Sequence, residues 1–165
     1  MNTPLYFPAV IAASFVGLLI GLIWYNPKVF GTMWKKEIGM SPDYKPDGKT
    51  MAITFGLTWL MCFFLSVAMA SMVIHQMGVY SLLTTTHDQV QIDLYQSIMD
   101  AYHSNFRSYR HGALHGAISA ITVAMPILVV GALFERRSWK YIFITVGYWL
   151  VTMIIMGAII CHFQP

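Results

Sequence analysis

Four long apolar stretches without Asp, Glu, Lys or Arg constrain this chain more than any other feature. They cover residues 7–25, 52–74, 113–134 and 141–161. A helix needs about 20 apolar residues to cross a hydrocarbon core of roughly 30 Å, and each stretch has that length. Because lipid cannot satisfy backbone polar groups, a spanning segment must form its own hydrogen bonds. The sequence therefore predicts an all-α polytopic membrane protein with four transmembrane helices.

The composition agrees with this class. Hydrophobic residues make up 57% of the chain and charged residues 10%, whereas a soluble domain has about 25% charged residues. The 165 residues have the length of one domain, and we expect residues 1–165 to form a single transmembrane domain. The first stretch is expected to be retained as a span, because no basic residue precedes it and it exceeds a usual signal core. Cys62 and Cys161 fall at different depths, which argues against a disulfide.

The distribution of basic residues predicts the topology. Of the ten Lys and Arg residues, only Arg107 and Arg110 lie in the second loop, and the other eight lie in the first and third. The positive-inside rule then places both termini and the outer segment 78–110 outward. We expect a multi-pass protein of a bacterial cytoplasmic (inner) membrane. The net charge is +3, and the basic residues behind it lie where the topology requires them. A nucleic-acid partner is therefore not expected.

Short interfacial helices are expected between the spans. The residues at 30, 33, 34 and 38 are apolar at helical spacing opposite Lys35 and Lys36, which predicts an amphipathic helix on the inner leaflet. Gly78 is a plausible end for the second span, and Thr86 with Gln89 has capping-box spacing. Segment 88–110 contains no Gly or Pro. It is either an outer amphipathic helix or the lower end of one very long helix, and the sequence leaves both open.

Three residues are expected to shape helix packing. Gly17 and Gly21 have the GxxxG spacing that lets another helix approach closely. Pro126 lies inside the third apolar stretch, where it removes a backbone donor and crowds the carbonyl of Thr122. A kink is expected at that point.

Three stretches together resemble a known family. They are residues 21–27 with Phe30, Gly31 and Trp34, residues 133–141, and residues 147–151 with Met156 and Gly157. These residues resemble the bacterial membrane family catalogued as domain of unknown function 1761, over nearly the whole chain apart from the second loop. The resemblance implies four transmembrane helices, with no established activity and no catalytic residues to carry over.

Histidines carry the most specific chemical pattern. His111 and His115 are four residues apart, a spacing by which one helix offers two imidazoles to a metal ion. A transition metal needs three or four such ligands. In the predicted topology the outer helix ends would bring further candidates to a similar depth, namely His75, His103 and His162, with Cys161 or Asp100 as possible completions. The metal would be Zn or Cu, and bis-imidazole haem is a weaker alternative.

Ordinary interpretations of these residues stand beside the metal hypothesis. Histidine is common at membrane interfaces, where it hydrogen-bonds to headgroups or backbone, and it titrates near neutral pH. The methionines of the second and fourth spans suggest a copper route, but methionine also fills apolar cores. At the inner boundary, Arg136, Arg137 and Lys140 form a basic cluster beside Glu135. This cluster either fixes the third span through an ion pair or binds anionic lipid.

Three functions remain open. The chain has no P-loop, nucleophile elbow, Cys-x-x-Cys or His-Glu-x-x-His, so an enzyme is not expected. The leading interpretation is a non-enzymatic structural or accessory protein that forms a homodimer or joins a membrane-protein complex. The second is a metal- or haem-binding membrane protein with an outward-facing histidine site. The third is a small transporter or lipid-binding protein, although no charged residue lies inside a span to couple ions.

Overall fold

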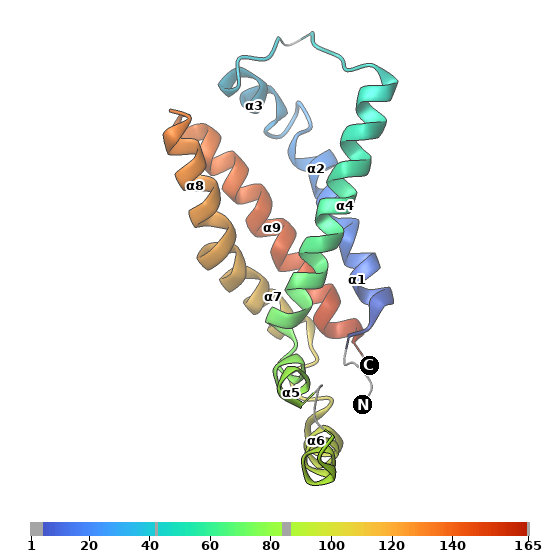
Figure 1. Ribbon diagram of the computed structural model, residues 1–165. Coiled ribbons are helices and arrows are strands. Elements are labelled where there is room, and N and C mark those ends of the chain that lie inside the picture. Colours follow the sequence, from blue (N-terminus) through green and yellow to red (C-terminus); the bar gives the residue numbers. More distant parts are fainter. Residues whose placement is uncertain (1–4, 42, 84–86, 165) are drawn as a thin grey trace.

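The computed structural model describes residues 5–41, 43–83 and 87–164, and every regular element in those ranges is a helix (Figure 1). The helices in chain order are α1 (Phe7–Ser14), α2 (Val16–Trp24), α3 (Gly31–Glu37), α4 (Gly48–Val73), α5 (Gln76–Leu83), α6 (Gln89–Tyr102), α7 (Tyr109–Ser119), the π-helical turn η1 (Ala120–Ala124), α8 (Met125–Phe134) and α9 (Trp139–Phe163).

Four helical stretches are long and apolar enough to cross a membrane. They are Phe7–Trp24, formed by α1 and α2, then α4, the continuous stretch Tyr109–Phe134 formed by α7, η1 and α8, and finally α9. The predicted all-α polytopic fold is therefore confirmed. The short helix expected after the first span is also present, as α3.

The last three spans begin before the uncharged stretches do, because a polar residue caps each helix. The side chain of Asp47 accepts a hydrogen bond from the backbone N–H of Thr50 at 2.9 Å. Ser108 caps α7 and Ser138 caps α9 in the same way. Each cap satisfies one of the backbone donors that a helix start leaves free.

α9 is the central helix of the bundle and packs against α1, α2, α4, α7 and α8. Three methionines, Met69, Met153 and Met156, lie in the core and are at most 2% exposed. Met61 and Met72 of α4 are instead exposed on the outside of the bundle. The buried methionines thus fill space between α4 and α9, as expected of a flexible apolar side chain.

Gly17 and Gly21 lie where the first span meets α4 and α9. A Cβ on Gly17 would meet the Cys62 sulfur at 2.4 Å, and one on Gly21 would lie 3.8 Å from the Tyr148 ring. The Tyr148 hydroxyl donates a hydrogen bond to the Gly17 carbonyl at 2.9 Å. The close approach at Gly17 is therefore an intramolecular one.

The third span departs from α geometry just before Pro126. In the π-helical turn η1, the backbone N–H of Met125 donates to the carbonyl of Ala120, a wider turn than that of an α-helix. The Thr122 hydroxyl donates to the Ile118 carbonyl at 2.7 Å. A π turn thus lies directly before the proline, and the kink expected at Pro126 stays a prediction.

Segment 78–110 differs from the expectation for Gly78, and it decides between the two alternatives left open for residues 88–110. α5 continues through Gly78, and the break falls earlier, at Ile74, whose backbone is extended (φ −111°, ψ 100°). α6 ends at Tyr102 and α7 begins at Tyr109, so one very long helix is excluded. Thr86 lies outside the described residues, and Asp88 caps α6 by accepting from the Val90 N–H at 3.0 Å.

The two ends of the bundle differ in what they carry. α5, α6 and both chain ends lie at one end, and α3 and the turn between α8 and α9 lie at the other (Figure 1). At the first end, the Tyr6 N–H donates to the Gln164 side-chain oxygen at 3.0 Å. We call this the terminal end of the bundle, and the other the α3 end.

Candidate metal site

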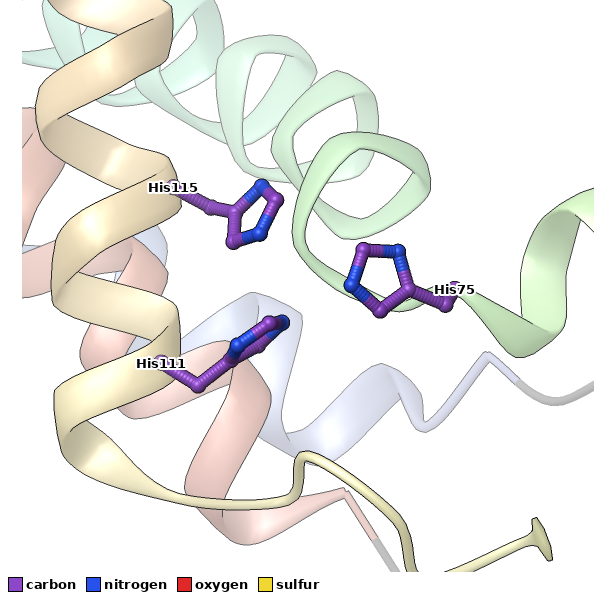
Figure 2. Close-up of side chains that lie close together, drawn as sticks. All are labelled: His75, His111 and His115. Carbon is purple, nitrogen blue, oxygen red and sulfur yellow. The ribbon is translucent and has the colours of Figure 1, made fainter.

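Three imidazoles meet at the terminal end of the bundle, those of His75, His111 and His115 (Figure 2). One nitrogen from each ring can be chosen so that all three lie within 4.8 Å of one another. The ring centroids are 4.4–5.0 Å apart. Because zinc–imidazole bonds are about 2.0–2.1 Å long, nitrogens that bind one zinc ion with tetrahedral geometry lie about 3.3–3.4 Å apart, so the three rings would move closer together to hold an ion.

Two of the imidazoles come from successive turns of α7. Residues four apart share one face of a helix, and Figure 2 shows the His111 and His115 rings directed to the same side. Ser108 caps this helix, with its hydroxyl accepting from the His111 backbone N–H at 3.3 Å. The first turn that carries His111 is thereby held in place.

Glycines set the rotation of α7 about its own axis. Gly112 and Gly116 face α9, where an added Cβ would lie 2.1 Å from the Gly157 carbonyl and 2.3 Å from the Met153 carbonyl, respectively. Each histidine precedes its glycine by one residue, which is about 100° around the helix. With the glycine face held against α9, the histidine face therefore points toward the end of α4.

The third imidazole comes from the break between α4 and α5. Since the extended backbone of Ile74 ends α4, His75 leaves the helix axis and turns toward α7 (Figure 2). The Ile74 side chain is buried at 1% exposure, whereas His75 is exposed. The break is thus fixed by a buried apolar side chain directly before His75.

Gln76 ties this break to the segment that leads into α7. Its buried side-chain amide donates to the carbonyls of Tyr102, His103 and Asn105, at 2.7, 3.3 and 3.2 Å. These carbonyls lie at the last residue of α6 and in the loop that follows it. One side chain thus joins the residue after His75 to the loop before His111.

Phe106 covers the site from the same loop. Its ring centroid lies 5.4 Å from that of His75 and 5.0 Å from that of His111. Its φ of 66° is in the left-handed region, which a bulky residue rarely adopts. The Cys161 thiol donates to the Phe106 carbonyl at 3.1 Å. Backbone strain of this kind tends to gather at functional sites.

Two polar groups in this region have no hydrogen-bond partner among the described residues. They are the buried Nε2 atom of His111 and the buried Nη1 atom of Arg107. Arg107 is oriented by its Nε atom, which donates to the His103 carbonyl at 3.1 Å, and burial lowers the pKa of its guanidinium. A buried imidazole nitrogen without a partner is a group that a metal ion would satisfy.

The other predicted ligands lie outside this group. His162 stacks on Tyr109, with 3.7 Å between ring centroids. His103 follows the end of α6 with an exposed side chain. Asp100 is exposed on α6, and Cys161 directs its sulfur to the backbone of the α6–α7 loop. Of the five histidines proposed from the sequence, the structure brings together His75, His111 and His115.

The basic cluster lies at the opposite end, where α8 ends and α9 begins. Arg137 forms an ion pair with Glu135 at 3.0 Å and lies over the Tyr141 ring. Arg136 adopts a left-handed φ of 55°. The backbone N–H groups of Arg136 and Arg137 donate to the carbonyls of Leu133 and Ala132, as in a Schellman motif. Glu135 and Arg137 thus pair within the turn, and Lys140 is exposed on the first turn of α9.

Sequence reasoning missed four residues that build the site, namely Gly112, Gly116, Gln76 and Phe106. Gly112 and Gly116 repeat the GxxxG spacing recognised at Gly17, and this signal was available. The role of Gln76 had no local signal, because its acceptors lie more than 25 residues away. Neither did the strained backbone of Phe106, since nothing in its neighbourhood requires a positive φ.

The fold and the site together define a polytopic, four-span, all-α membrane protein with a histidine cluster at one end of its bundle. The chain belongs to the family described as protein of unknown function (DUF1761), whose model matches residues 8–161. This match confirms the family resemblance. Neither a curated protein nor a solved structure matches the chain.

Proposed function

We propose that this protein binds a divalent transition metal through His75, His111 and His115. The observation that carries the proposal is the convergence of three imidazole nitrogens within 4.8 Å from two separate elements. Neutral imidazole is a good ligand for zinc and copper. Three protein ligands leave a fourth position for water or a small ligand, and the exposed His75 lies on the open side of the site.

The same geometry favours a single ion over haem. Bis-imidazole haem needs two rings on opposite faces of the porphyrin. His111 and His115 project from one helix face with their centroids 4.4 Å apart, and His75 lies about as close to both. This spacing leaves no room for a macrocycle between any two of the rings.

Metal binding by matched histidine variants tests the proposal. We expect detergent-purified protein, stripped and then titrated with Zn²⁺ or Cu²⁺, to bind one ion per chain. His75→Ala, His111→Ala and His115→Ala should each weaken binding at least 10-fold, because each removes one of three ligands. His103→Ala and His162→Ala serve as controls, and should bind as the unchanged protein does.

Two results would refute the proposal. One is the absence of stoichiometric binding of either ion to the folded protein. The other is equal loss from the control and cluster variants, which would show nonspecific binding to surface imidazoles.

We also propose that the site faces outward from a bacterial inner membrane, with both termini on its side. The asymmetry of lysine and arginine supports this orientation, since eight of the ten lie in the loops of the α3 end. Self-association, membership of a larger membrane complex and the absence of enzymatic activity stay predictions. The detergent-corrected mass of the purified particle tests the first of these.

A further inference from the structure

The first half of α4 stands away from the other helices at the α3 end (Figure 1). Every residue from Gly48 to Leu57 is exposed, including Ile53, Phe55 and Leu57. The second half of the same helix is different, since Cys62, Ser66 and Met69 are fully buried. α4 therefore packs at the terminal end and leaves an opening beside α2 at the other.

This opening contains a groove with a volume of about 650 Å³. Leu18, Leu22 and Phe55 line it with apolar side chains from α2 and α4, and Tyr148 and Trp149 of α9 form its back. Leu22 is 62% exposed. All these residues belong to stretches that cross the membrane, so lipid chains are the solvent at this depth.

A second cavity, of about 680 Å³, adjoins the groove at the membrane boundary. Tyr25 and Pro27 line both cavities, so the two cavities lie next to each other. Here the lining includes Lys35 and Lys36 of α3. The combined site is apolar along the span and positively charged at its end.

We propose that this site binds an anionic phospholipid. The headgroup phosphate lies at Lys35 and Lys36, and one acyl chain lies in the groove between α2 and α4. Basic pockets between transmembrane helices recognise anionic headgroups in this way. The proposal is independent of the histidine site, which lies at the other end of the bundle.

Charge favours a lipid over a second copy of the chain. A second copy would have to offer carboxylates to the two lysines, but three of the four acidic side chains at the α3 end, all except Asp43, already have partners. Glu37 accepts a hydrogen bond from Ser138, Asp47 from Thr50, and Glu135 pairs with Arg137. An anionic lipid supplies both the charge and the apolar chain that the two cavities require.

Native mass spectrometry of the full detergent-purified chain tests the proposal. We expect one phosphatidylglycerol to bind more tightly than phosphatidylcholine. Lys35→Gln/Lys36→Gln should weaken phosphatidylglycerol binding roughly 10- to 30-fold, since each lysine near an anionic headgroup contributes about a factor of five. Arg136→Asn/Lys140→Gln removes two charges from the same end and should change binding less than twofold.

A groove-filling variant tests the place of the acyl chain. Thr54 lines the groove and is exposed, so Thr54→Trp should reduce lipid binding at least 10-fold. Leu57→Trp, on the same helix and outside the groove lining, should bind as the unchanged protein does. The proposal would be overturned if the Lys35/Lys36 and Arg136/Lys140 variants lost phosphatidylglycerol binding to the same extent, or if Thr54→Trp bound the lipid as the unchanged protein does. A dimer of the chain that carries no lipid would also overturn it.

Discussion

At the scale of single residues, α7 carries two interleaved patterns with different tasks. Its glycines let the backbone of α9 approach, and the histidine before each glycine points to the end of α4. The backbone contact between α7 and α9 therefore positions His111 and His115 without involving their side chains. A substitution at a glycine should affect both the stability of the bundle and the histidine cluster.

Gly112→Ala tests this relation. The added methyl group would lie 2.1 Å from the Gly157 carbonyl, so the two helices must separate. We expect the free energy of unfolding to fall by about 1–3 kcal/mol, as in other overpacked interiors, together with weaker Zn²⁺ binding. Unfolding of the purified protein in mixed micelles measures the first effect.

Gly131→Ala is the control for this substitution. No described atom lies within 4 Å of a Cβ at that position. The variant should be as stable as the unchanged protein or slightly more so, because alanine has the higher helix propensity. Equal stability of Gly112→Ala and Gly131→Ala would contradict the role given to the α7–α9 contact.

At the scale of elements, the number and kind of the spans could be predicted because they depend only on length and apolar composition. Their starts could be predicted less well, since charged or polar caps such as Asp47 extend a helix beyond its apolar stretch. The pair His111 and His115 follows from helical periodicity. The position of His75 beside these two histidines could not be predicted from periodicity, because it depends on the break at Ile74 and on contacts between distant segments.

Gln76 provides a test at this scale, since it holds α6 and the α6–α7 loop to the end of α4. Gln76→Leu removes three hydrogen bonds and leaves partly buried carbonyls unsatisfied. We expect a loss of about 1–3 kcal/mol in the free energy of unfolding and faster proteolysis between Tyr102 and Tyr109. Gln96→Leu, at an exposed position of α6, should show neither effect.

At the scale of the whole molecule, the bundle is polarised. The histidine cluster, α5 and α6 lie at the terminal end, whereas most of the basic residues and the proposed lipid site lie at the α3 end. If the positive-inside rule holds here, the two sites face different compartments.

Cysteine labelling tests this orientation. In intact cells, a membrane-impermeant thiol reagent should modify Gln96→Cys, on α6 at the terminal end. Asp43→Cys, at the opposite end, should react only after the membrane is opened. Both positions are exposed, whereas Cys62 and Cys161 are buried. Labelling in the reverse order would show that the terminal end faces the cytosol.

The interruption of the helix at Ile74 has a mechanical consequence. α5 and α6 follow this break in the chain and lie beyond the end of α4. The proposed metal ion would link His75, next to the break, to α7. Loading the ion would then restrain a pair of helices that contact the bundle at few points, and amide hydrogen exchange in residues 76–102 should slow. In this way the binding of one ion at the bundle would make α5 and α6 more rigid.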